Sequence, residues 1–328
     1  MPAPSDLTIN GSGSSFVYPI LSQWIYTWDQ DTASDINYNP VGSVLGEQAL
    51  AQGTVTFAAS EIPLPKESLQ KREQAQFPIV LGGVVICVNL PNMKASDFVI
   101  DGKTLVAIYE GKITRWDDPA IKALNPDLDL PGRKITPVFR TDGSGTTWAF
   151  AQYLTKNDPE WGKKFPTSAI IDWPVGIGAR GNVELAAYIS TIPYSLGYVE
   201  YAYAIENRLK ISSMRNADGK IVQPDLETFT STLDSIDWDN VTNFDIDLVD
   251  RPGANAWPIT AMSFIIMSQA PKDEDAAKEI LRFFDWCYNN GSSIAKDLYF
   301  VPLPDEAVNR IHAYWSINIQ ANGKPVYR

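Results

Sequence analysis

Short apolar segments alternate along this chain with glycine- and serine-containing turns that lead directly into helical patterns. Residues 7–9 read as a strand and residues 11–16 as a loop, and the apolar positions after Pro19 follow helical spacing. Residues 36–41 again read as extended, and Ser43 is placed to cap the helix that follows. Repeated units of strand, small-residue turn and helix predict an α/β fold of doubly wound sheets. Ligands of such sheets bind beyond the carboxyl ends of the strands.

One of these turns combines the groups that hold a multiply charged tetrahedral oxyanion. Residues 140–147 read Arg-Thr-Asp-Gly-Ser-Gly-Thr-Thr and lie between an apparent strand and a helical pattern. The segment supplies the Arg140 guanidinium, a carboxylate that can orient it, and backbone N–H groups at a helix N-terminus. The turns at Ser15 and Ser43 occupy equivalent strand ends, so three helix N-termini could converge on one anion. Taken singly, Ser15 and Ser43 could each be ordinary helix caps.

Length and charge limit what this turn can serve. The chain has 328 residues, and two domains are the default for that length. Its 27 basic and 39 acidic residues give a net charge of −12, which argues against nucleic acid or an anionic membrane as the main partner. Two uncharged runs, residues 77–93 and 253–271, contain glycine or proline, and we expect buried β segments there rather than membrane spans.

Cysteine and histidine are too few for a metal centre. Cys87, Cys287 and His312 are the only such residues, no ligand spacing is available, and no cofactor is expected. Both cysteines have apolar neighbours and are expected to be free and buried. The first residues contain no basic segment followed by an apolar one, so the chain is either cytosolic or a mature form without its export signal.

A second glycine pattern needs weighing. Residues 176–181 match G-x-G-x-x-G, and Glu200 lies about as far onward as a ribose-binding acid would. However, the sequence Asp-Trp-Pro precedes the glycines instead of a buried strand, and the segment lies in the middle of the chain. A glycine loop that opens a helix over residues 182–189 is therefore favoured over dinucleotide binding.

Four short loops follow one another along the chain, and the four in this order form a more specific pattern than any one of them alone. They read Gly-Ser-Gly-Ser-Ser-Phe at 11–16, Val-Gly-Ser at 41–43, Ala-Ala-Ser-Glu at 58–61 and Arg-Thr-Asp-Gly-Ser-Gly-Thr at 140–146. Together they resemble the anion loops of the periplasmic phosphate-binding proteins of the high-affinity phosphate (Pst) ABC transporter. The resemblance runs nearly end to end, with further similar segments at residues 108–116, 124–126, 197–203 and 257–260.

The resemblance implies a type II periplasmic-binding-protein fold of two lobes, with two crossing strands as the hinge. Lobe 1 would comprise residues 1–82 and 258–328, and lobe 2 residues 83–257. Phosphate would bind in the cleft between the lobes, and binding would close the hinge. The implied role is that of a periplasmic monomer that delivers inorganic phosphate to the membrane permease of an ABC transporter for high-affinity uptake, without enzymatic activity.

The same resemblance assigns roles to individual residues. The implied phosphate-binding residues are Ser15, Phe16, Ser43, Glu61, Arg140, Asp142, Ser144, Gly145 and Thr146. Ser15 and Ser43 would donate hydroxyls and Phe16 a backbone N–H. Arg140 would bind the anion while paired to Asp142, and residues 144–146 would cradle it. Glu61 departs from the family, in which an aspartate at this position accepts the proton of the bound phosphate.

A carboxylate in an anion site provides discrimination. Phosphate near neutral pH still carries a proton that it can donate, whereas sulfate carries none and would place a negative oxygen against a buried acceptor. Alternatively, Glu61 is an exposed turn residue before Pro63. Other readings remain open: another tetrahedral oxyanion such as phosphite or arsenate, or a free-standing phosphate-scavenging or adhesion protein. An enzyme using Ser144 would lack both a G-x-S-x-G elbow and an adjacent base.

Overall fold

The computed structural model describes residues 7–32, 34–91, 98–234, 236–241 and 243–327, so residues 1–6 of the predicted lobe 1 and residues 92–93 of one uncharged run lie outside the described part. The chain divides into two compact units. The first comprises Met1–Leu81, Asp237–Ile246 and Met262–Arg328, and the second comprises Gly82–Ile236 and Asp247–Ala261.

The first unit contains a short segment from the middle of the chain, Asp237–Ile246, which the sequence analysis assigned to lobe 2. Two contacts account for its place. The ring of Phe244 packs edge-on against Tyr314 with centroids 5.5 Å apart, and Arg310 donates to the Val241 carbonyl at 3.4 Å. Such long-range packing leaves no local pattern in the sequence.

The elements of the first unit include two strands, β4 and β12, that continue into the second. In chain order they are β1 (Thr8–Gly13), α1 (Tyr18–Asp31), β2 (Asp35–Asn39), α2 (Ser43–Ala51), β3 (Phe57–Ser60), α3 (Lys66–Arg72), β4 (Gln74–Val88), the 3-10 helix η2 (Trp238–Asn240), β12 (Thr260–Ser268), α11 (Glu274–Asn290), α12 (Ser292–Asp297), β13 (Val301–Pro302), α13 (Asp305–Asn318), β14 (Gln320–Ala321) and β15 (Lys324–Pro325).

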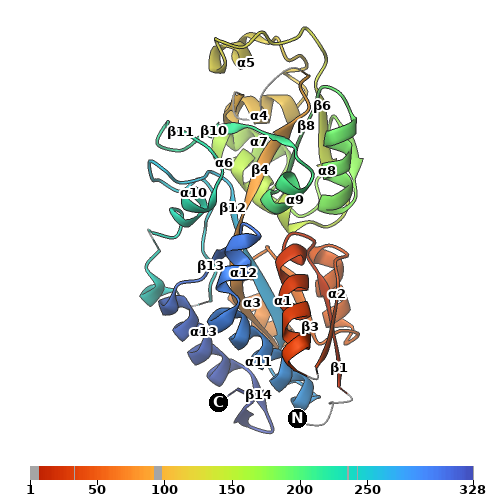
Figure 1. Ribbon diagram of the computed structural model, residues 1–328, viewed down its shortest axis with the longest axis vertical. Coiled ribbons are helices and arrows are strands. Elements are labelled where there is room, and N and C mark those ends of the chain that lie inside the picture. The colour runs from red at the N-terminus through yellow and green to blue at the C-terminus, as the bar shows by residue number, and fades with distance from the viewer. Residues whose placement is uncertain (1–6, 33, 92–97, 235, 242, 328) are drawn as a thin grey trace. The chain divides into compact units, whose positions relative to one another are not determined.

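Strand β1 is central to the sheet of this unit. It pairs in parallel with β2 and with β3, while β12 pairs antiparallel with β3. Helix α2 packs against β1 and β3, and α1 and α2 lie beside these strands in Figure 1. The prediction of a loop from residue 11 is wrong for its first part. Gly11 pairs with both Tyr38 and Phe57, so β1 continues to Gly13 before it leaves the sheet.

The second unit is built around a sheet of its own. Its further elements are β5 (Val99–Ile100), α4 (Gly102–Tyr109), α5 (Pro119–Leu124), β6 (Thr136–Arg140), α6 (Gly145–Asn157), α7 (Pro159–Lys164), β7 (Ile177–Ala179), α8 (Gly181–Thr191), β8 (Ser195–Glu200), α9 (Tyr201–Glu206), β9 (Lys210–Ile211), β10 (Ser213–Arg215), β11 (Ile221–Val222) and α10 (Leu226–Thr230).

Strand β6 takes the central position here, parallel to β8 and to β7. Strand β4 runs antiparallel to β8, and α8 packs on β6 and β8, as Figure 1 shows. An aromatic cluster fills the core behind the end of β6; it consists of Tyr109, Phe150, Trp161, Trp173 and Tyr198. Offset and edge-on rings of this kind stabilise a core beyond their buried area.

The two uncharged runs contain most of β4 and all of β12, the strands shared by the two units. Every residue of β4 is buried, as are all but the last of β12. Within the described residues, no helix is long and apolar enough to span a bilayer, and no group of three or more His, Cys, Asp or Glu side chains could hold a metal ion. Cys87 and Cys287 are free and buried, as predicted.

Candidate anion-binding site

One group of candidate anion-binding residues lies in the first unit, around the Glu61 carboxylate directly after β3. Only 2% of Glu61 is exposed, so the reading of it as an exposed turn acid is wrong. Ser14 Oγ donates to Oε2 at 2.6 Å, Ser43 Oγ donates to Oε2 at 3.4 Å, and Ser263 Oγ of β12 donates to Oε1 at 3.1 Å. A buried carboxylate is tolerated only when it is hydrogen-bonded, and three hydroxyls meet that need here.

Close backbone approach brings these hydroxyls together. Ser14 N donates to the Ala59 carbonyl and Gly42 N donates to the Gly13 carbonyl, each at 2.8 Å. Gly13 has φ +138°, and a Cβ there would lie 2.2 Å from Ala59 O, so only glycine fits at this crossing. The ends of β1 and β3 and the start of α2 are thereby fixed against one another.

Ser43 is not the helix cap that its position predicted. The N-cap of α2 is Gly42, no side chain caps the helix, and Ser43 is its first residue. The Ser43 hydroxyl instead donates to Glu61. Ser43 is 1% exposed. It is therefore a buried donor on a carboxylate, which is a site feature rather than a local helix signal.

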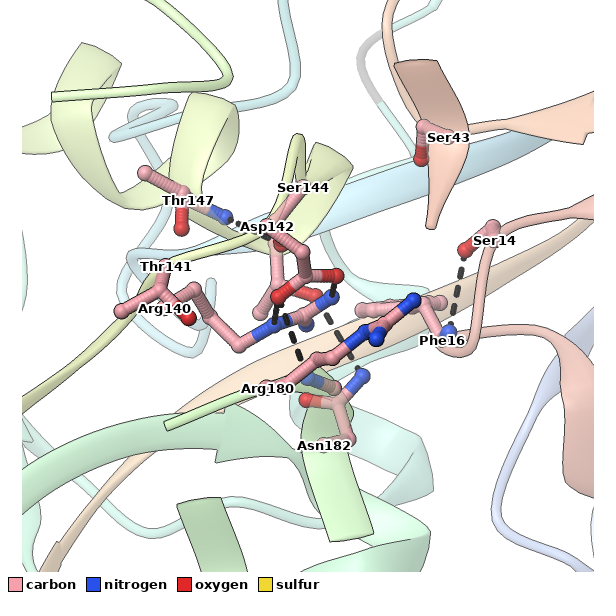
Figure 2. Close-up of polar contacts among 12 residues, drawn as sticks. Ser14, Phe16, Ser43, Arg140, Thr141, Asp142, Ser144, Thr147, Arg180 and Asn182 are labelled. Carbon is pink, nitrogen blue, oxygen red and sulfur yellow. Dashed lines mark hydrogen bonds and ion pairs between the residues drawn. The ribbon is translucent and has the colours of Figure 1, made fainter. Parts of the chain in front are cut away.

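Ser15 and Phe16 lie in the loop between β1 and α1 and are both buried. The Phe16 N–H, predicted to face the anion, donates to Ser14 Oγ at 2.9 Å (Figure 2). Ser14 thus accepts from Phe16 and donates to Glu61. The sequence pattern indicated the neighbouring Ser15 and not Ser14.

A second group of candidate anion-binding residues lies in the second unit and begins with Arg140 at the end of β6. Its guanidinium faces the Asp142 carboxylate in a two-point contact, with Nε at 2.6 Å from Oδ1 and Nη2 at 2.5 Å from Oδ2 (Figure 2). The exposed fractions of the two side chains are 2% and 7%. The structure therefore brings together the predicted pair, as a fork geometry that fixes the plane of the guanidinium.

Burial acts to raise the pKa of Asp142. The hydrogen bonds and charge of Arg140, with the N–H of Gly181 donating to Oδ1 at 3.0 Å, outweigh that effect and hold the pKa below its usual value. Asp142 is thus held ionised and orients Arg140. Buried Nη1 of Arg140 has no hydrogen-bond partner among the described residues. A buried charged donor of this kind suits an anion.

The turn after β6 is held at several points. Ser144, predicted to help cradle the anion, caps α6 by accepting from Thr147 N at 3.1 Å, and its own N–H donates to Ala169 O at 3.0 Å. Gly145 and Thr146 follow as the first two residues of α6 and are buried. Their N–H groups belong to the first turn of the helix, at the positive end of the helix dipole.

A buried tyrosine ties both ends of this turn together. Tyr198 OH accepts from Arg140 N at 3.2 Å and lies 2.7 Å from Thr147 Oγ1. Burial raises the pKa of Tyr198 to about 12, so it remains a neutral hydroxyl. Tyr198 lies in the family-like segment 197–203, but that segment gave no sign of a contact with the Arg140 turn, because strand β8 reaches β6 only through tertiary pairing.

The second glycine pattern supplies contacts to the Arg140 turn. Gly181 begins α8 and donates its N–H to Asp142, and Asn182 Nδ2 reaches Thr146 Oγ1 at 3.5 Å. Glu200, the candidate ribose acid, is fully buried and caps α9 by accepting from Ala202 N. The predicted helix over residues 182–189 is confirmed within α8, and the loop before it supports the Arg140 turn.

Comparison with known proteins shows the family to which the chain is similar. The family described as the PBP superfamily domain matches residues 2–290. A relative from Xylella fastidiosa named phosphate-binding protein PstS is 42% identical over 94% of this chain and 85% of its own length. Another of the same name, from Pasteurella multocida, is 38% identical over 98% of this chain and 94% of its own length.

Solved structures agree at the level of the fold. A high affinity periplasmic phosphate-binding protein (PfluDING) bound with phosphate is similar with a TM-score of 0.76 at 20% identity, over 98% of both chains. The phosphate binding protein from Stenotrophomonas maltophilia gives a TM-score of 0.72 at 18% identity, over 97% of both chains. The two-lobed α/β periplasmic-binding-protein fold predicted from the sequence is confirmed. The chain belongs to the PBP superfamily and, within it, to the family of the phosphate-binding proteins PstS.

Proposed function

We propose that this protein binds inorganic phosphate in the periplasm and delivers it to the membrane permease of an ABC transporter for high-affinity uptake. Its relatives carry the name of phosphate-binding proteins, and the two groups of residues described above have the donors and acceptor that hydrogen phosphate requires. The protein acts as a monomeric binder and not as an enzyme.

The observation that carries the proposal is the buried Arg140 fork. Two of its nitrogens are fixed by Asp142, and the buried Nη1 has no hydrogen-bond partner among the residues described. Leaving a buried charged donor unsatisfied is costly, so its retention favours a ligand that accepts from it. Phosphate oxygens accept such bonds, and we propose that the N–H groups of Gly145 and Thr146 add to them.

Glu61 supplies the selectivity in this proposal. Its buried carboxylate can accept the proton that phosphate retains near neutral pH, whereas sulfate has no proton to donate. Sites built around a substrate hydrogen bond reject analogues that lack it by about 10⁴- to 10⁵-fold. Arsenate resembles phosphate in charge and protonation, so discrimination against it is not expected from Glu61.

Titration calorimetry of anion-free protein tests the proposal. We expect one phosphate per chain and sulfate affinity weaker by orders of magnitude, because only phosphate can donate to Glu61. Arsenate and phosphite belong in the same series, as competitors. Comparable affinities for phosphate and sulfate would contradict the proposed ligand. Radiolabelled phosphate uptake in a strain lacking the protein separates a transporter component from a free-standing binder.

Glu61→Gln should change the ratio of the two affinities in favour of sulfate. The amide can donate through its nitrogen to a fully ionised oxygen, which the carboxylate cannot do. The quantity to measure is the ratio of the sulfate and phosphate dissociation constants, since absolute affinity also changes with charge. Glu47→Gln is a matched control, because Glu47 accepts from the buried Ser60 hydroxyl at 3.1 Å in the same unit. An unchanged ratio in Glu61→Gln would place Glu61 outside the ligand contacts.

A further inference from the structure

Of the three serine hydroxyls described above that donate to Glu61, that of Ser14, which the sequence pattern did not indicate, is at the shortest distance. Ser14 Oγ lies 2.6 Å from Glu61 Oε2, within the range of a hydroxyl hydrogen bond to an ionised oxygen. Both residues are buried, Ser14 with 2% and Glu61 with 2% exposed. This bond is therefore formed away from bulk water, where hydrogen bonds are strong and their loss is costly.

The direction of the bond follows from Phe16. A backbone N–H can only donate, so Ser14 Oγ accepts from Phe16 N at 2.9 Å. The Ser14 hydroxyl proton then points at Glu61 Oε2, which accepts it. On the other carboxylate oxygen, Ser263 Oγ donates to Oε1 at 3.1 Å. Hydroxyl protons thus reach both oxygens of Glu61, and both oxygens act as acceptors.

We propose that Ser14, with Ser263, positions the Glu61 carboxylate as a hydrogen-bond acceptor and so sets the preference for a protonated oxyanion over a fully ionised one. The inference rests on the proposed phosphate-binding function and extends it. An acidic side chain discriminates between phosphate and sulfate only if it accepts a hydrogen bond from the ligand. A protonated carboxyl group would donate to sulfate as readily as to phosphate. Hydrogen bonds to the charged form favour that form. Ser14 and Ser263 act through Glu61 and are positioning residues.

The test is a double-mutant cycle on the ratio of the sulfate and phosphate dissociation constants, measured by calorimetry. We expect Ser14→Ala to lower that ratio about 10- to 100-fold, the range for loss of a hydrogen bond to a charged group. In the Glu61→Gln background the same substitution should leave the ratio unchanged, because its effect passes through the carboxylate. A role of Ser14 in the fold alone would alter both backgrounds equally.

Ser12, two residues before Ser14, is a matched control. Ser12 is also buried on β1, and its hydroxyl donates to the Asn39 carbonyl at 3.1 Å instead of to Glu61. Ser12→Ala should leave the ratio unchanged. If Ser14→Ala does not fold, the cycle with Ser263→Ala decides in the same way, because that hydroxyl holds the other carboxylate oxygen.

The outcomes separate this inference from the proposed function. Absence of phosphate binding by the unmodified protein overturns the proposed function and the inference with it. Normal binding by the unmodified protein with an unchanged ratio in Ser14→Ala, or with an equal effect in the Glu61→Gln background, overturns the inference alone. A lowered ratio confined to the background that retains Glu61 supports it.

Discussion

Arg140→Ala is expected to weaken phosphate binding about 30-fold to several thousand-fold, since loss of one partner in a buried hydrogen-bonded charge contact costs about 2–5 kcal/mol. The substitution removes the Nη1 donor and leaves Asp142 buried without its cation. Calorimetry gives the dissociation constant, and circular dichroism at neutral pH should show that the fold persists.

Arg115 provides a control with the same geometry in a different environment. It contacts Asp117, two residues onward, through Nε at 2.9 Å and Nη2 at 3.1 Å, as Arg140 contacts Asp142. The Arg115 side chain is 56% exposed, whereas that of Arg140 is 2% exposed. Arg115→Ala should leave phosphate affinity unchanged. A change of less than about threefold in Arg140→Ala would show that Arg140 does not bind the ligand.

Asp142→Asn is expected to lower the free energy of unfolding of the anion-free protein by about 3–5 kcal/mol at neutral pH. Removing one charge of a buried pair leaves the other uncompensated, here the Arg140 guanidinium. The asparagine retains the shape of the side chain, so the effect reports charge and not volume. Urea denaturation followed by fluorescence measures it, and Asp117→Asn, in the exposed pair, should leave the transition where it is.

The pH dependence of this difference has a definite sign. The pKa of Asp142 is lowered in the folded protein, so its contribution is fully present above the pKa of an unfolded aspartate, about 3.9. It is lost as the pH falls through the lower, folded value. The gap between the original protein and Asp142→Asn should therefore be constant near neutral pH and shrink only in acid. A gap that shrinks between pH 6 and about pH 5 would mean that another group is responsible.

Sequence patterns predicted the elements and contacts that depend on residues close together in the chain. The helix at Pro19 follows from apolar spacing, the helix after Ser144 follows from the helical pattern behind the turn, and the Arg140–Asp142 pair follows from proximity in the sequence. The extension of β1 through Gly11 did not follow, because glycine and serine are typical of loops. Pairing with β2 on one side and β3 on the other makes that segment a strand.

Contacts between distant residues account for the rest of the site. Ser263 lies 202 residues after Glu61, and Tyr198 lies 58 residues after Arg140. Ser263 belongs to no motif, Tyr198 lies in a family-like segment outside the predicted site, and each is placed by strand pairing within its unit. Ser14 is different, since it adjoins a serine that was selected. Ser14 and Ser15 differ in the direction of their side chains, and the sequence does not predict that direction.

The hydrogen bonds that hold the Arg140 turn affect how much conformational entropy the turn loses when a ligand binds. Tyr198, Ala169, Ala179 and Gly181 each hydrogen-bond to residues between Arg140 and Ser144. A segment fixed in this way loses little conformational entropy when it takes up a ligand, because its backbone is already restricted in the free protein. More of the interaction energy then appears as affinity. In the proposed function, the same rigidity would disfavour an anion whose oxygens are spaced differently, in addition to the discrimination assigned to Glu61.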